Sequence, residues 1–227
     1  MREIILDTET TGLSPLTGDR LVEIGCFELI NHLPSGKTYH VYINPERDMP
    51  KEAEAVHGLS AQFLKDKPLF KTVAQDFLDF IQEAPLIIHN ASFDMGFLNF
   101  ELGKIGKPAI PNSQVIDTLM LARKAHPMGP NSLDALCRRY GVDNSKRTKH
   151  GALLDAELLA EVYLELIGGR QTALILKTEI TARKIEIQTQ RPLQRSRTSP
   201  LPTRLSEVES ELHQAKVKVL GSDSFWN

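Results

Sequence analysis

Two acidic residues near the N-terminus have the spacing of a metal-binding pair. Asp7 and Glu9 follow the apolar run Ile4-Ile5-Leu6, which is typical of a buried strand. Positions two apart on a strand point to the same face, so the two carboxylates would lie side by side. Like charges held that close repel each other unless a positive charge lies between them. Such oxygen ligands suit Mg²⁺ or Mn²⁺; the alternative is a strand end with two solvated acids.

Acidic residues in two other segments favour the metal interpretation. Asp94 closes the segment 89–94, His-Asn-Ala-Ser-Phe-Asp, which follows the apolar run 86–88. Asp155 lies early in a helical pattern that extends to Ile167. Four carboxylates from three segments are what a two-metal phosphodiesterase site needs, with the metals roughly 3.5–4 Å apart on the attacking and leaving oxygens.

His150 is the candidate for proton transfer. It precedes Asp155 by five positions, and at about 100° per helical residue that offset puts the two side chains on different faces of a helix. We therefore expect His150 on the loop before the helix and Asp155 within the helix. A loop imidazole near metal ions can take a proton from an attacking water at neutral pH. The alternative is a histidine without a catalytic role, on the surface or in the core.

Together these motifs resemble those of the DEDDh family of 3′→5′ exonucleases. The segments that match are 7–12, Asp-Thr-Glu-Thr-Thr-Gly, then 89–94, and His150 with Asp155. Within the family, segments 131–137 and 143–148 are similar to the proofreading subunits of bacterial DNA polymerase III. The resemblance covers residues 2–176 well and the tail only loosely.

The resemblance implies roles for the matching residues. Asp7, Glu9 and Asp155 would bind the catalytic metal and the substrate, and Asp7 would bridge to a second metal. Asp94 would act on that second metal through water. His150 would be the general base. The implied cofactors are two divalent ions, Mg²⁺ or Mn²⁺.

Three further residues are implied to bind the 3′-terminal nucleotide. His57 matches a segment that lines the nucleotide pocket, although a turn residue before Gly58 is an equally good interpretation. Leu13 would wedge between the last two bases. Phe93 would contact the terminal sugar or base, and a role in the core is as good an alternative because aromatic residues beside apolar runs usually pack inward.

The elements expected around these residues form an α/β fold. The patterns predict strands at 2–9, 21–31, 37–44, 85–89 and 114–116, a hairpin turn at 33–36, and helices at 72–82, 92–102, from about 117, at 132–139 and at 152–167. A three-stranded meander followed by alternating helices and strands predicts a mixed sheet covered by helices. This agrees with the ribonuclease-H-like five-stranded fold that the resemblance implies.

The chain beyond the last predicted helix divides into three segments. A catalytic domain of residues 1–169 should end at the Gly168-Gly169 pair. In segment 170–176, the residues Gln171, Leu174 and Leu176 resemble the sliding-clamp (beta) binding motif of replication proteins. The composition of segment 177–204 predicts a flexible linker. Segment 205–227 predicts a short amphipathic helix over 205–219, and by resemblance it would bind the polymerase's catalytic (alpha) subunit.

Composition limits the cellular setting and the mode of DNA binding. The chain has 227 residues, 41% of them hydrophobic, and a net charge of −2. Acidic residues are in excess up to residue 169, which suits an enzyme that holds a few nucleotides of a single-stranded 3′ end better than one that grips long duplex DNA. The chain lacks an apolar run near 18 residues and starts directly with a strand, so we expect no membrane span and no signal peptide. Two cysteines, Cys26 and Cys137, fit a reducing cytoplasm.

The function expected from these observations is proofreading. A 3′→5′ exonuclease of this kind would remove mispaired nucleotides during DNA replication and release deoxynucleoside 5′-monophosphates. Two alternatives are a ribonuclease of the same family and a binding scaffold without activity. The linker and tail speak against the ribonuclease, and the intact set of acids with His150 speaks against the scaffold.

Overall fold

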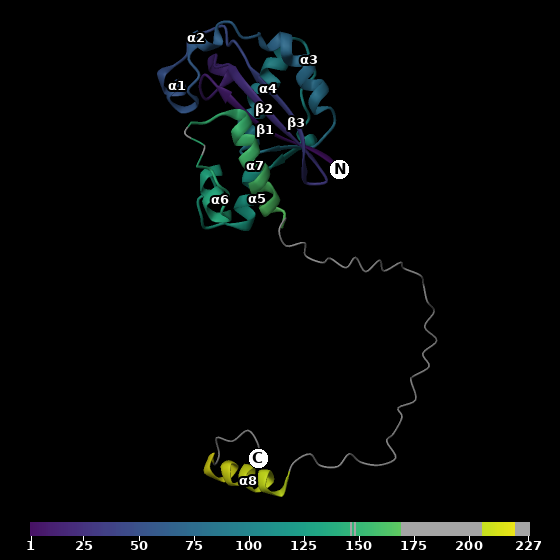
Figure 1. The fold of residues 1–227 in the computed structure, drawn as a ribbon, viewed down its shortest axis with the longest axis vertical. Coiled ribbons are helices and arrows are strands. Elements are labelled where there is room, and N and C mark those ends of the chain that lie inside the picture. Colours follow the sequence, from purple (N-terminus) through teal and green to yellow (C-terminus); the bar gives the residue numbers. More distant parts are fainter. Residues whose placement is uncertain (146, 148, 169–205, 221–227) are drawn as a thin grey trace, which may run out of the picture. The chain divides into compact units, whose positions relative to one another are not determined.

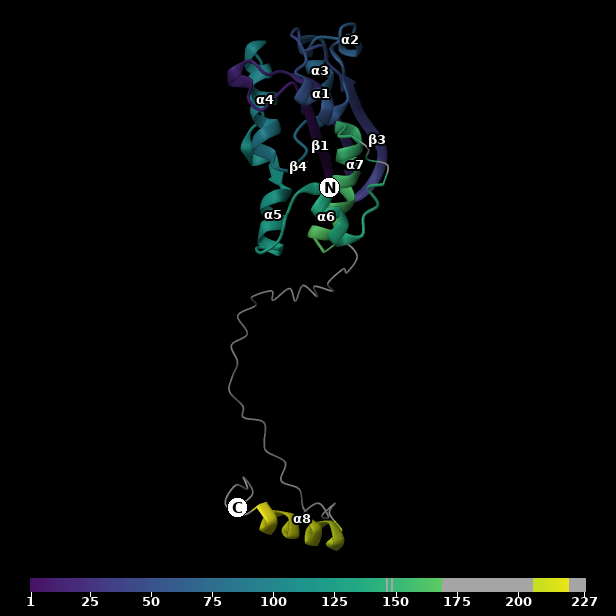
Figure 2. The same cartoon turned by 90° about the vertical axis from the view of Figure 1, so that its left-hand side faces the viewer.

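The computed structural model describes residues 1–145, 147, 149–168 and 206–220. These residues fall in two units, Met1–Leu176 and Lys177–Asn227, and each unit is described by itself. Figures 1 and 2 show the sheet and helices of the first unit and the helix α8 (Glu207–Leu220) of the second. Within the described ranges, no helix combines the length and the apolar character needed to cross a membrane.

A mixed five-stranded sheet with the order β3-β2-β1-β4-β5 forms the centre of the first unit. The strands are β1 (Arg2–Thr10), β2 (Leu21–Ile30), β3 (Leu33–Tyr42), β4 (Leu86–Ile88) and β5 (Val115–Asp117). The first three pair in antiparallel fashion, whereas β4 is parallel to β1 and to β5. The C-terminal ends of β1 and β4 therefore lie at the same edge of the sheet. The predicted fold class is confirmed.

Helices cover both faces of this sheet. They are α1 (Lys51–His57), α2 (Ala61–Leu64), α3 (Phe70–Ile81), α4 (Ala91–Lys104), α5 (Thr118–Ala125), α6 (Leu133–Tyr140) and α7 (Ala152–Leu166), with 3-10 turns at Pro15–Thr17 and Asn112–Gln114. Helices α3 and α4 share one core cluster with the sheet, and α7 packs on the opposite face in a second. Figure 2 shows α4 and α7 on opposite sides of β1. Helices α5 and α6 pack against α7 in a third cluster.

The alternation of side chains along β1 decides which residues face α7. Ile4 and Leu6 are buried in the cluster of α3 and α4, whereas Ile5 packs with α7. Because the side-chain period of a strand is two residues, Asp7 and Glu9 project from the same face as Ile5. The strand thus directs both acids toward the helix that carries Asp155.

The hairpin between β2 and β3 differs from the predicted one. Its turn lies at Asn31 and His32, whose φ angles of 52° and 65° are those of a type I′ turn. Positions 33–36, predicted as the turn, belong to β3, where Leu33 pairs with Ile30. Pro34 indicated a turn, but β3 is an edge strand, and an edge strand tolerates a residue without an N–H group.

Two short helices were missing from the prediction. Helix α1 follows Pro50 and ends at Gly58, which has a φ of 77°. Helix α2 begins after Ser60, whose side chain accepts a hydrogen bond from the Phe63 N–H group. These are ordinary cap residues, but neither helix is long enough to give a recognisable period of apolar residues.

Helix α8 is present where a helix was predicted within 205–219. Ser206 and Glu209 form a reciprocal cap: Ser206 Oγ accepts from the Glu209 N–H group at 3.3 Å, and the Ser206 N–H group donates to Glu209 Oε2 at 2.9 Å. The apolar side chains Val208, Leu212 and Val219 are 65%, 66% and 83% exposed. The predictions for segments 170–176 and 177–204 fall outside the described residues.

Helix α7 approaches the sheet most closely at Gly25 of β2. A Cβ atom at this position would lie 2.3 Å from the backbone carbon of Ala152 and 2.3 Å from the nitrogen of Leu153. Backbone atoms cannot rotate away as a side chain can, so any larger residue would push the start of α7 off the sheet. Asp155 lies in the first turn of α7, and Gly25 therefore fixes how near this acid comes to β1.

Replacing Gly25 by Ala should lower the free energy of unfolding by about 1–3 kcal/mol, because the added methyl group overpacks a backbone contact. Gly96→Ala is the matched control, since Gly96 lies in α4 with nothing within 4 Å of the added Cβ. That variant should gain about 0.5–1 kcal/mol from helix propensity. Denaturant unfolding measures both, and a Gly25→Ala protein as stable as the wild type would contradict the close packing.

Candidate active site

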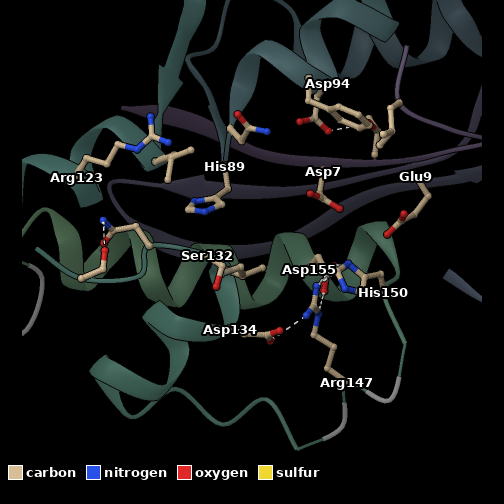
Figure 3. Close-up of a pocket in the computed structure, with 18 residues that line it drawn as sticks. Asp7, Glu9, His89, Asp94, Arg123, Ser132, Asp134, Arg147, His150 and Asp155 are labelled. Carbon is tan, nitrogen blue, oxygen red and sulfur yellow. Dashed lines mark hydrogen bonds and ion pairs between the residues drawn. The ribbon is translucent and has the colours of Figure 1, made fainter. Parts of the chain in front are cut away.

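A cavity of about 790 Å³ lies where β1 and β4 end (Figure 3). The acids Asp7, Glu9, Asp94 and Asp155 all line it, and so does His150. Residues from α5 and α6 continue the lining away from the acids; they include Leu119, Arg123, Ser132, Leu133 and Asp134. The structure thus brings together in one cavity the predicted metal ligands and the predicted base.

Each acid is positioned by the end of a regular element. Asp7 and Glu9 lie near the C-terminal end of strand β1, and Asp155 lies in the first turn of helix α7. Asp94 lies in the first turn of α4, where the Thr8 hydroxyl donates a hydrogen bond of 2.7 Å to its Oδ1. Thr8 faces α4 because it alternates with Asp7 along the strand. One strand therefore positions acids on both of its sides.

Among the described residues, a group of possible metal ligands consists of Glu9, His150 and Asp155. Each offers one ligand atom, and these atoms all lie within 4.8 Å of one another. Figure 3 shows Asp7 facing the same space, with Asp94 on its other side. Carboxylate oxygens with one imidazole nitrogen are a donor set that Mg²⁺ or Mn²⁺ can use.

Burial, together with the charges of neighbouring acids, opposes the ionisation of the carboxyl groups in this cluster. Burial, followed by the charges of Asp94 and Glu9, holds the pKa of Asp7 well above its ordinary value. Burial and the charge of Asp155 raise the pKa of Glu9 to about 8. Burial also raises the pKa of Asp94 to about 7, although the hydrogen bond from Thr8 opposes the change. These three carboxyl groups can all be ionised at the same time only if a positive charge lies near them. A divalent cation would supply that charge.

Arg147 supplies a positive charge next to this cluster, and sequence reasoning did not assign it a role. Its Nε and Nη2 atoms donate to Asp155 Oδ1 and Oδ2 at 2.5 and 2.7 Å. Its Nη1 atom donates to Asp134 Oδ1 at 2.9 Å. Burial opposes the charge of Arg147, yet the hydrogen bonds and charges of these two carboxylates raise its pKa overall. The sequence feature that could have indicated a role for Arg147 is its position three residues before His150.

His150 lies on the loop before α7, as predicted, and its imidazole is 48% exposed. Its Nδ1 atom lies 2.8 Å from Arg147 Nη2 and 3.5 Å from Asp155 Oδ2. The backbone N–H group of His150 donates to the carbonyl of Val56 at 3.2 Å. Lys149 Nζ donates to the carbonyl of Ala55 at 3.2 Å. The unpredicted helix α1 therefore holds the loop that carries His150.

The residues implied to bind a nucleotide occupy different settings. Leu13 lines the cavity with 85% of its surface exposed. Phe93 also lines it, and its ring packs against Phe97 with centroids 5.1 Å apart, so it belongs partly to the core. His57 is buried at the end of α1 and lies outside the set that lines the cavity; its Nδ1 accepts the Leu59 N–H group at 3.0 Å. Burial lowers the pKa of His57.

Comparisons with known proteins agree with this geometry. Residues 4–163 match the sequence profile of a family described as "Exonuclease". The chain is 58% identical to the DNA polymerase III subunit epsilon of Rickettsia conorii over 176 residues, which is 76% of either chain. It is 43% identical to the subunit of the same name from Salmonella typhimurium over 236 residues, which covers 99% of this chain and 97% of the relative.

A comparison with solved structures identifies the same fold in an exonuclease. The nuclease domain of 3′hExo, a DEDDh family member, superposes with a TM-score of 0.64 over 74% of this chain and 92% of its own, at 17% sequence identity. This match shows the shared fold. The sequence matches cover most of both chains. The chain therefore belongs to the exonuclease family, and within it to the epsilon subunits of DNA polymerase III.

Proposed function

We propose that this chain is the proofreading 3′→5′ exonuclease of a bacterial replicative polymerase and that it uses two divalent ions, Mg²⁺ or Mn²⁺. The observation that carries the proposal is the convergence of four carboxylates and one imidazole in a single cavity. Its products are deoxynucleoside 5′-monophosphates. The kinship with epsilon subunits supports DNA as the substrate in preference to RNA.

The proposed roles follow from where the side chains lie. Asp7, Glu9 and Asp155 would hold one metal ion, and Asp7 and Asp94 would hold the second. Bound there, the ions would supply the positive charge that stabilises the oxygens of the phosphodiester during hydrolysis. His150, on the exposed side of the cluster, takes the proton from the attacking water. Its partial exposure leaves the imidazole free to pass that proton to solvent.

The cavity favours a 3′ end that has separated from its partner strand. Leu13 is the most exposed apolar side chain in the lining, and we assign it to the gap between the last two bases. Phe93 lines the same cavity, and we assign it to contact the terminal nucleotide. The terminal base must leave its stack to reach the acids, and unpairing costs a few kcal/mol, least at a mismatch.

Two further contacts attach the enzyme to the replication machinery. The exposed apolar side chains Val208, Leu212 and Val219 of α8 lie on a helix too short to bury them alone, and we assign them to the polymerase's catalytic (alpha) subunit. Segment 170–176, with Gln171 and Leu176, is assigned to the sliding clamp (beta). Leu176 offers less area than an aromatic residue, so the clamp contact should be in the micromolar range or weaker, about −8 kcal/mol.

The function predicts faster removal of mispaired ends. With Mg²⁺, initial rates on a primer with a 3′ mismatch should exceed those on a matched primer by about tenfold or more, since 1.4 kcal/mol of unpairing energy corresponds to a factor of ten. Single-stranded DNA should be cut at least as fast as the mismatch, and an RNA of the same sequence more slowly. Equal rates on matched and mismatched primers would refute proofreading, and faster cutting of RNA would favour the ribonuclease alternative.

Replacing Glu9 by Gln should abolish cleavage and stabilise the metal-free protein. The pKa of Glu9 in the folded protein is raised to about 8. As the pH rises from the ordinary pKa of a glutamate, which applies in the unfolded chain, to the folded-state value of about 8, the Glu9 carboxyl group therefore opposes folding increasingly. With a chelator present, the variant should be more stable than the wild type by about 1–2 kcal/mol near pH 8.5, and nearly equal to it near pH 5.

Glu28→Gln is the matched control for that measurement. Hydrogen bonds from Ser35 and Arg2 lower the pKa of Glu28, so this carboxylate favours folding, and its replacement should destabilise the protein at neutral pH. Thermal melting across pH reports both variants. Loss of stability in Glu9→Gln near pH 8.5 would show that its carboxylate is already compensated in the metal-free protein.

Deletion of residues 177–227 should separate cleavage from assembly. The shortened chain keeps the cavity and should degrade single-stranded DNA at the wild-type rate, but it should no longer co-purify with the alpha subunit. In the full chain, replacing Gln171 and Leu174 by Ala should weaken binding to the clamp alone. Unchanged affinity of the shortened chain for the alpha subunit would show that the contact lies elsewhere.

A further inference from the structure

A single guanidinium group contacts both a proposed metal ligand and the proposed base. Arg147 is 7% exposed, and its fork meets both oxygens of Asp155, at 2.5 and 2.7 Å. The Nη2 atom of the same fork lies 2.8 Å from His150 Nδ1. Figure 3 shows the guanidinium between Asp155, His150 and Asp134. We call this set of contacts the closed arrangement.

The closed arrangement competes with a cation for Asp155. Both carboxylate oxygens accept charge-assisted hydrogen bonds from Arg147, and a bidentate pair of this kind is among the stronger contacts in proteins. Asp155 is 3% exposed, so it has little room for a further partner. A cation that binds an Asp155 oxygen on the side of Glu9 therefore competes with the fork for the negative charge of this carboxylate.

The closed arrangement also leaves His150 without a nitrogen that can accept a proton. A guanidinium can only donate, so His150 Nδ1 accepts the hydrogen bond from Arg147 Nη2. In the neutral imidazole the proton is then on Nε2, and neither nitrogen has a free lone pair for a water proton. His150 becomes a competent base only when Arg147 withdraws.

We propose that Arg147 is a positioning residue that keeps Asp155 and His150 in the closed arrangement until a divalent cation binds Asp155 and displaces it, which frees the base in the same event. This inference rests on the proposed metal-dependent function. It goes further by coupling metal binding to the readiness of the base. It also assigns a role to a residue outside the acid and histidine motifs.

Asp134 gives the displaced guanidinium a place to stay. This acid lies on α6, its side chain is 47% exposed, and it already accepts Nη1 of Arg147 at 2.9 Å. Arg147 can release Asp155 and retain Asp134 without exposing an unpaired buried charge, which would otherwise be costly. The displacement is therefore a local change of partner.

The first test is a calorimetric titration of the full chain with Mn²⁺ alone, without DNA. If Arg147 competes with the metal, the apparent dissociation constant of the wild type equals the intrinsic constant divided by the fraction of molecules in which Arg147 has released Asp155. Arg147→Gln should then bind Mn²⁺ roughly tenfold more tightly. Arg147→Lys keeps the charge but loses the bidentate fork, so it should also bind more tightly than the wild type.

Arg123→Gln is the control for charge alone. Arg123 lines the same cavity, and Figure 3 shows it at the opposite end from Asp155. Its replacement should leave Mn²⁺ affinity close to that of the wild type. If Arg123→Gln and Arg147→Gln gain the same Mn²⁺ affinity and Arg147→Lys gains none, the effect depends only on removing a positive charge. That result would overturn the inference. Weaker Mn²⁺ binding by Arg147→Gln would mean that Arg147 preorganises Asp155 for the metal, which also overturns it.

The second test follows His150 directly by nitrogen NMR of the imidazole at about pH 8.5, where an ordinary histidine is neutral. A His150→Gln variant assigns the signals. In the wild type, Mg²⁺ should shift the Nδ1 resonance as the hydrogen bond from Arg147 is lost, and in Arg147→Gln it should shift much less. An Nδ1 resonance that Mg²⁺ leaves unchanged in the wild type would refute the coupling. A wild-type chain that binds no Mn²⁺ and cuts no DNA would instead refute the proposed function.

Discussion

The repulsion among carboxylates in one cavity is the constraint on which the rest of this structure depends. Asp7, Glu9, Asp94 and Asp155 come from three segments and meet at one edge of the sheet. Burial raises the pKa of the first three, and the charges of neighbouring acids of the cluster add to the rise at Asp7 and Glu9. Phosphodiester DNA adds more negative charge at the same place. A fold that assembles such a group must hold it rigidly, because the acids would separate if the backbone allowed it.

The rigidity comes from packing that lies some distance from the acids. Alternation along β1 sends Ile4 and Leu6 into one core and Ile5 into the other, which fixes the direction of Asp7 and Glu9. The absence of a side chain at Gly25 lets α7 lie against β2. These contacts stabilise the fold and oppose the electrostatic cost of the site. Arg147 reduces that cost near Asp155, and a bound cation would reduce it across the cluster.

Sequence reasoning reached the parts of the site that depend on local periodicity. The i, i+2 spacing of Asp7 and Glu9 placed them on one face of a strand, and the offset of His150 from Asp155 placed the histidine on a loop. It failed where distant segments decide the outcome. The hairpin turn at Asn31 was missed because Pro34 outweighed it locally, although an edge strand accommodates Pro34. The role of Arg147 was missed although it lies three positions before His150, because its carboxylate partners Asp134 and Asp155 lie on different helices that come together only in the folded chain.

Proton release on metal binding tests the central claim most directly. If crowded carboxyls hold protons because they lack a counter-charge, Mn²⁺ must expel those protons when it binds. Calorimetric titrations at about pH 7, in two buffers with different ionisation enthalpies, measure the number released. The account predicts net release that declines as the pH rises above the pKa of Glu9, about 8. Binding with no proton release at about pH 7 would contradict it, because the acids would then already be ionised and compensated without metal.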